Sequence, residues 1–152
     1  MKRIFLSACA VSMCLVFALN GTAQIAVNQH PVEKPALFHE LPEKFSCSLP
    51  ALKTLFTSVA NGKVAIQLSN QLQLNGTVLE KVAVSSQQLS VNIRCDNFQN
   101  ALLNISRLTL ENGTYKYVGR MVSPAHGDVL LLWEDNGQYY FIKQKQLLSM
   151  VE

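Results

Sequence analysis

The sequence predicts a mainly β protein, with one short helix followed by about seven or eight antiparallel strands that form a small barrel or a two-layer sandwich. After residue 62, apolar and polar residues alternate along most of the chain, which is typical of strands with one buried face. Asn-Gly pairs at 75–76, 112–113 and 136–137 fall between such runs. Asn-Gly is a strong signal of a tight hairpin turn, because both residues tolerate positive φ.

Residues 1–23 have the features of a signal peptide. Lys2 and Arg3 precede the apolar residues 4–19, and a Gly-Thr-Ala sequence supplies small residues at the expected cleavage site. We therefore expect export to the periplasm or the extracellular space. The alternative is a lipoprotein anchored through Cys9, although its apolar region would then be unusually short.

The remaining chain has a nearly balanced charge. Of the 13 Lys and Arg residues, 11 remain after the first 23 residues are removed, against 10 Asp and Glu, which gives a net charge of about +1. This balance argues against a nucleic-acid partner, which requires a clustered basic surface. No later apolar run approaches the ~20 residues of a membrane-spanning helix. We expect a single β-rich domain over residues 45–152.

Residues 24–44 are expected to form a flexible arm. The segment contains three prolines and no sustained apolar period, and proline removes a backbone donor that a strand or helix needs. Two alternatives are an edge that wraps around the domain and a segment that orders on a partner. Phe38 and Leu41 are the candidate anchors in both cases.

Residues 48–60 carry the only helical pattern after the signal, because their apolar residues recur at steps of three and four. Ser48 is a suitable N-cap, and Pro50 lies in the first turn, where its missing N–H has no cost. Gly62 is expected to adopt the left-handed conformation that ends the helix.

The alternating segments predict the strands. The pair at 75–76 marks either a hairpin or a bulge within one long strand, because apolar residues continue to Val84. Residues 129–133 are apolar on both faces, so this strand should be central and covered on both sides. The expected strands cover residues 63–68, 71–84, 88–95, 101–110, 115–123, 128–134 and 138–143, with a short one near 147–151.

Cys47 and Cys95 are the two cysteines outside the signal segment. An even number of cysteines in an oxidising compartment predicts one disulfide between them. The alternative is a pair of buried free thiols, which behave as small apolar side chains.

No catalytic, metal-binding or cofactor-binding constellation emerges, so we expect a protein that is not an enzyme. Ser123, His126 and Asp128 are the residue types of a nucleophilic triad, but three members of one short loop rarely face one another. A turn explains this segment better. Because loops often carry binding residues, His126 and Asp128 remain candidates for contact with a partner.

The aromatic residues of the C-terminal half suggest a binding surface. Tyr139 and Tyr140 are adjacent and must face opposite sides of a strand, so one of them should be exposed. Together with Tyr117 and Arg120, they could stack on sugars or contact another protein.

The last third of the chain also carries a pattern of tyrosines, glycines and turn residues. It consists of Tyr117, Gly119, Pro124, Gly127, Asp128, Gly137 and Tyr139. This pattern resembles uncharacterised β-rich domains of secreted Bacteroidetes proteins, some of which are attached to larger exported proteases. No protease motif accompanies it, so the resemblance implies no activity.

These observations predict an exported, non-enzymatic module that binds another exported or cell-envelope protein, as an accessory or inhibitor-like subunit. The arm, the loop at 123–128 and the tyrosine-rich sheet are the candidate surfaces. The alternative is a small barrel that binds an apolar ligand or a surface glycan. The sequence leaves the oligomeric state and the identity of the partner open.

Overall fold

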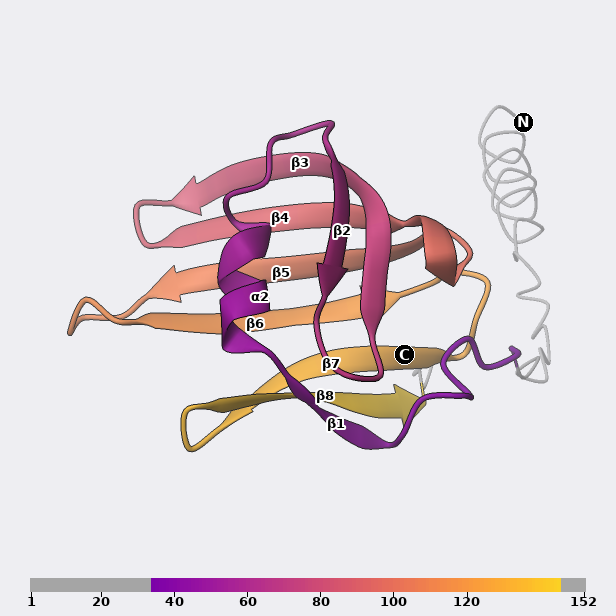
Figure 1. The fold of residues 1–152 in the computed structure, drawn as a ribbon. Coiled ribbons are helices and arrows are strands. Elements are labelled where there is room, and N and C mark those ends of the chain that lie inside the picture. Colours follow the sequence, from indigo (N-terminus) through magenta and orange to yellow (C-terminus); the bar gives the residue numbers. More distant parts are fainter. Residues whose placement is uncertain (1–33, 146–152) are drawn as a thin grey trace, which may run out of the picture. The chain divides into compact units, whose positions relative to one another are not determined.

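A computed structural model describes residues 34–145, and this part of the chain is mainly β, as predicted (Figure 1). Helix α2 (Leu49–Leu55) is its only α-helix, and a single turn of 3-10 helix, η1, covers Asp96–Phe98. The strands are β1 (Lys44–Cys47), β2 (Lys63–Gln67), β3 (Gln73–Ser85), β4 (Gln88–Cys95), β5 (Ala101–Thr109), β6 (Tyr115–Val122), β7 (Asp128–Asp135) and β8 (Gln138–Lys145).

The eight strands form one antiparallel sheet in the order β1-β8-β7-β6-β5-β4-β3-β2. The sheet curls into a half-barrel, and α2 lies across its concave face (Figure 1). We call this face the inner face and the opposite one the outer face. The two edges of the sheet meet where the Ser48 N–H donates to the Leu68 carbonyl over 2.7 Å. The architecture is therefore a single curled sheet and not a two-layer sandwich.

Helix α2 begins as predicted but is shorter than the expected 48–60. The Ser48 hydroxyl caps the Ala51 N–H, and a proline occupies the first turn. The helix ends after Leu55, where hydroxyl side chains of the next residues bond to backbone carbonyls and so compete with the helical pattern. Asn61, with φ of 62°, takes the left-handed conformation that the sequence suggested for Gly62.

The Asn-Gly pairs have three different roles. The pair at 75–76 lies inside the long strand β3, as in the second alternative, but the two register shifts come later, between Val78 and Glu80 and between Ala83 and Ser85. The pair at 136–137 makes the expected tight turn, with φ of 51° and 76°. At 112–113 only Gly113 has positive φ, because the hairpin closes with a three-residue loop between Leu110 and Thr114.

The core fills the space between α2 and the inner face. Residues on the buried side of the helix meet alternate residues of every strand except the exposed end of β3. Side chains that are almost completely buried include Leu52, Leu55, Leu74, Ile93, Leu103, Ile105, Met121, Leu130 and Phe141. The interior is therefore packed with side chains, as the many large apolar residues indicate.

The disulfide prediction is wrong. Cys47 and Cys95 are buried free thiols. Cys47 pairs with Tyr139 on β8, whereas Cys95 pairs with Ala101 on β5, so β1 and β4 are separated by four intervening strands in the sheet. A disulfide needs Cα atoms within about 7 Å of each other. The alternation that placed Cys95 among buried residues was correct, but it carries no information on pairing.

The two thiols make stability depend on alkaline pH. Burial raises the pKa of Cys47 and of Cys95 from 9.0 to about 12, so the folded protein retains protons that the unfolded chain loses above pH 9. The contribution of the neutral thiols to the free energy of unfolding is fully present below pH 9. It should fall by about 1.4 kcal/mol per pH unit for each thiol up to about pH 12. Urea unfolding across this range measures the slope. Replacing both cysteines with alanine should remove the thiol contribution and leave that of Tyr117 and Tyr139, whose pKa values are also raised by burial. An unchanged slope would contradict this assignment.

Residues 34–43 pack against the domain, which corrects the expected flexibility for this half of the arm. Phe38 is fully buried and Leu41 half-buried, so both act as the predicted anchors. The ammonium group of Lys143 donates to the carbonyls of Phe38 and Leu41 and pairs with Glu43. Strand β1 then continues along the edge of the sheet beside β8. The wrapping alternative therefore describes this segment.

The signal segment, the first part of the arm and the expected strand near 147–151 lie outside the described residues. Within the described part, no helix is both long and apolar enough to cross a membrane. In residues 34–145, no three His, Cys, Asp or Glu side chains come together in a way that could hold a metal ion.

Candidate functional site

The six candidate binding residues occupy three separate places. Tyr117 and Tyr139 lie on the inner face and are buried. Arg120 and Tyr140 lie on the outer face, where Arg120 is exposed and Tyr140 half-buried. The remaining two, His126 and Asp128, are buried where the loop at 123–128 meets the arm.

The loop and the arm hold each other in place. The Asp128 carboxylate accepts the N–H groups of Leu37 and Phe38, each over 2.7 Å. Nδ1 of His126 and the hydroxyl of Ser123 share a hydrogen bond of 2.8 Å. Because the carboxylate is occupied by the arm and all three triad-like residues are buried, this cluster has a structural role and offers no accessible nucleophile.

Gly127 permits this close contact. Its N–H donates to the carbonyl of Pro35, and a Cβ at this position would lie 2.9 Å from the carbonyl oxygen of Lys34. Lys34 in turn donates to the carbonyl of Pro124. Two of the three surfaces suggested by the sequence, the arm and the loop, are thus joined to each other, so neither is a free edge.

The outer face of the C-terminal strands carries an apolar surface, which we call the outer patch. Its residues project from β5 to β8 on the side away from α2, as the strand registers require. Trp133 is its most exposed apolar member, with 57% of its surface accessible. The outer patch consists of Leu102, Val118, Arg120, Leu131, Trp133 and Tyr140.

The other half of the outer face is polar and internally bonded. Asn104 donates to Asn92 over 2.5 Å, and Asn92 donates to Glu80 over 2.5 Å. The hydroxyls of Ser90 and Ser106 bond to each other at 2.6 Å. These polar side chains satisfy one another across β3, β4 and β5, so they do not depend on a partner for hydrogen bonds.

Arg120 lies at the boundary between the two halves. In the register it is opposite Asn104 on β5 and Leu131 on β7. Among the described residues, no carboxylate pairs with its guanidinium group. Nearby, the ammonium of Lys44 lies 4.2 Å from the centre of the Tyr140 ring. The outer patch thus combines exposed apolar and aromatic area with positive charge.

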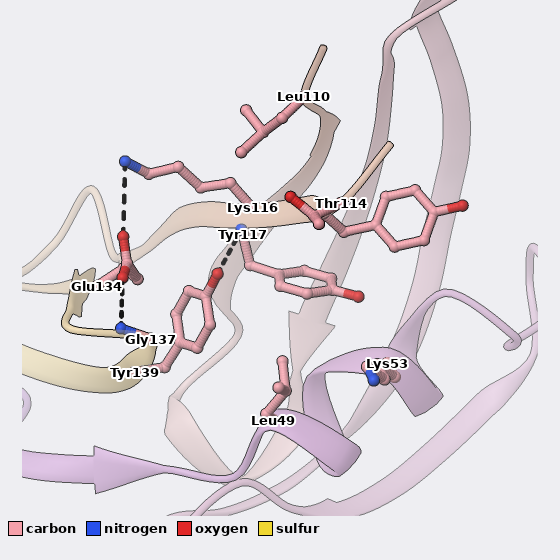
Figure 2. Close-up of a pocket in the computed structure, with 10 residues that line it drawn as sticks. Leu49, Lys53, Leu110, Thr114, Lys116, Tyr117, Glu134, Gly137 and Tyr139 are labelled. Carbon is pink, nitrogen blue, oxygen red and sulfur yellow. Dashed lines mark hydrogen bonds and ion pairs between the residues drawn. The ribbon is translucent and has the colours of Figure 1, made fainter. Parts of the chain in front are cut away.

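A cleft of about 310 Å³ opens at the hairpin end of the sheet (Figure 2). Helix α2 contributes Leu49 and Lys53 to one side, and the β5–β6 hairpin contributes Leu110 and Thr114 to the other. Three tyrosines also line it, Tyr115, Tyr117 and Tyr139, together with Lys116, Glu134 and Gly137. We call this space the tyrosine cleft.

Hydrogen bonds and one ion pair order the floor of the tyrosine cleft (Figure 2). The Tyr139 hydroxyl oxygen accepts the backbone N–H of Tyr117 over 3.0 Å, and the two rings meet edge to face at 5.6 Å. Glu134 accepts the Gly137 N–H over 2.8 Å and lies 3.8 Å from the Lys116 ammonium. Burial raises the pKa of Tyr117 and of Tyr139, so both phenols are neutral near pH 7.

Tyr140 and Arg120 were predicted from the sequence as binding residues, whereas Trp133, which dominates the outer patch, was placed in a strand that was expected to be covered on both sides. The side chain of Trp133 projects from the same side of β7 as those of Leu131 and Val129. The apolar sequence of residues 129–133 indicated that both faces of this strand carry apolar side chains, but it did not show that one of these faces is partly exposed. Val129 is buried, whereas Trp133 is exposed. Within the described residues, the outer face of β7 is therefore covered at Val129 but not at the tryptophan.

Comparison of this chain with protein-family models, curated proteins and solved structures finds no match. The resemblance to secreted Bacteroidetes domains therefore stays a prediction, and function has to be argued from the geometry.

Proposed function

We propose that this protein is an exported, non-enzymatic module that binds another exported or cell-envelope protein through the outer patch. The observation that carries the proposal is the exposed Trp133 beside Tyr140 and beside Arg120, with which no carboxylate pairs in residues 34–145. Trp, Tyr and Arg are the residues that most often dominate binding energy in protein interfaces. An exposed apolar surface with a polar surround is also typical of an interaction site.

The charges of the outer patch specify the chemistry of the partner. Arg120 belongs to the outer patch, and Lys44 lies beside it over the Tyr140 ring, so both contribute positive charge, whereas the Glu80 carboxylate in the polar half is already bonded to Asn92. A partner that offers an apolar surface with an acidic residue opposite Arg120 would complement this arrangement. Charge complementarity of this kind sets orientation and association rate more than affinity.

Capture from the exported fraction of the source cells tests the proposal with a matched pair of variants. Leu102 and Val82 are equally exposed, at 40% and 41%, and both lie on the outer face, but only Leu102 belongs to the outer patch. Leu102→Asp should abolish stoichiometric capture of the partner, whereas Val82→Asp should preserve it. Capture that survives Leu102→Asp would contradict the proposed surface.

A second candidate function is supported by the tyrosine cleft. Its leucines and tyrosines suit a small apolar ligand, and its charged residues, Lys53, Lys116 and Glu134, would contact a polar end of that ligand. Leu110 lines the cleft and is 42% exposed, whereas Leu79 on β3 has similar exposure and lies elsewhere. An apolar fluorescent probe should bind with a stoichiometry of about one, as expected for a single cleft. Leu110→Asp should remove this binding and Leu79→Asp should retain it. No saturable binding to the wild-type protein would exclude this function.

A further inference from the structure

Arg107 is held between two aromatic rings on the inner face of β5. Its guanidinium carbon lies 4.5 Å from the centre of the Tyr115 ring and 5.5 Å from that of Phe56. Contacts of this kind stabilise a cation and restrict the orientation of its planar group. The side chain is half-buried, so its position is set by packing and not by solvent.

No acceptor satisfies this guanidinium group among the described residues. Nε of Arg107 is buried and makes no hydrogen bond, and none of the ion pairs in residues 34–145 involves this residue. A buried donor without an acceptor is destabilising and calls for an explanation. The two neighbouring rings interact with the guanidinium group through their π-electrons, and Nε makes no hydrogen bond to the Tyr115 hydroxyl.

Arg107 also lines a second cleft, of about 220 Å³, at the β3–β4 hairpin. Its lining is small or polar apart from one leucine, and Arg107 is its only charged residue. The lining residues are Ala83, Ser85, Ser86, Gln87, Gln88, Leu89, Arg107 and Thr109. The cleft therefore combines hydroxyl and amide groups with a single positive charge.

We propose that this second cleft binds a small monoanionic carboxylate and that Arg107 is its anchor. A guanidinium group presents N–H donors in a planar fork that matches the two oxygens of a carboxylate. One unopposed positive charge balances one negative charge, which favours a monoanion over a phosphate or sulfate dianion. The short apolar part of the ligand would contact Leu89 and Ala83.

This site is independent of the outer patch. Arg107 is opposite Leu89 and Tyr117 in the register, both of which face α2, whereas the outer patch faces the other way. Binding of a carboxylate and binding of a protein partner can therefore be tested separately, and failure of one leaves the other standing.

The experiment compares butyrate with butyramide, its neutral isostere, on the purified wild-type protein at constant ionic strength. Two-dimensional ¹H–¹⁵N spectra that include the arginine Nε–H region report on Arg107 and on the backbone of residues 83–89. Butyrate should shift these signals saturably in the millimolar range, which is typical of a ligand with few atoms. Butyramide should produce no saturable shift, because its neutral amide cannot form an ion pair with the guanidinium group and offers one acceptor oxygen instead of two. Saturation by both ligands or by neither would overturn the proposal.

Variants then test the anchor. Arg107→Gln should weaken butyrate binding by at least about tenfold, and Arg107→Lys should restore only part of it, because an ammonium group lacks the planar fork. Lys81→Gln is the matched control, since Lys81 is also a cation on the inner face but donates to the Phe56 carbonyl. Equal weakening by Lys81→Gln, or equally tight binding of inorganic sulfate to the wild type, would contradict a monoanion site at Arg107. If Arg107→Gln fails to fold, the butyrate and butyramide comparison decides alone.

Discussion

Replacing Asp128 with alanine is expected to lower the free energy of unfolding by about 3 kcal/mol, because it removes a charged acceptor from two buried bonds. Its carboxylate, 4% exposed, accepts the N–H groups of Leu37 and Phe38 and so ties the arm to β7. Alanine leaves both N–H groups without an acceptor and loosens the packing around the fully buried Phe38 ring. Urea denaturation measures the loss.

Two comparisons make this prediction specific. Asp128→Asn keeps one carbonyl acceptor and should lose about half as much stability. Asp135→Ala, at an exposed position in the β7–β8 hairpin, should change stability by less than about 0.5 kcal/mol. Limited proteolysis of Asp128→Ala should cut first within residues 34–43. A loss below about 1 kcal/mol with an uncut arm would show that other contacts hold this segment.

Replacing Trp133 with alanine is expected to weaken binding to the partner by about 30-fold or more, the effect of losing at least ~2 kcal/mol at an interface hot spot. The side chain is 57% exposed in the free protein, so most of its burial would occur on binding. For the same reason, folding stability should fall by no more than about 1 kcal/mol. Calorimetry with the captured partner measures the affinity.

Val84→Ala is the control for this variant, because Val84 is 58% exposed on β3, outside the outer patch. Its affinity should stay within about twofold of the wild type, as expected for a residue outside an interface. Arg120→Ala should reduce the rate of association more than it increases dissociation, since exposed charges act mainly on encounter. If Trp133→Ala binds as tightly as Val84→Ala, the outer patch is not the interface.

Most of the strand pattern could be predicted because alternation and turn chemistry are local properties. Seven of the expected strand segments fall within the described residues, and β2 to β8 occupy them. The Asn-Gly pair at 75–76 shows where local reasoning is ambiguous. A Cβ on Gly76 would lie 2.3 Å from the Arg94 carbonyl oxygen, so this glycine serves the close approach of two strands rather than a turn.

Strand β1 and the packed arm could not be predicted because their stability comes from distant residues. Lys44–Cys47 is too short to show a period, and it forms a strand only because β8 supplies a partner almost 100 residues later. Similarly, Asp128 and Lys143 supply the side-chain partners of the arm. The disulfide prediction failed for the same reason, since spacing along the chain says nothing about strand order in the sheet.

The candidate site was predicted in part. Alternation placed Tyr139 and Tyr140 on opposite faces, and the structure agrees. Alternation could not tell which face α2 covers, and so it could not assign Trp133 to the exposed side. Arg107 gave no signal at all in the sequence, because its isolation from carboxylates depends on the neighbours that three strands and the helix bring together.

Site-specific photo-cross-linking tests the proposed interface most directly. A photoreactive amino acid is placed at position 118 in the outer patch or, as the control, at position 84, so that Trp133 stays in place, and the protein is mixed with the exported fraction of the source cells. We expect one major adduct from position 118, competed by unlabelled wild-type protein and not by Leu102→Asp, and no such adduct from position 84. An adduct that forms equally at both positions, or none at position 118, would contradict the claim that the outer patch binds a protein partner.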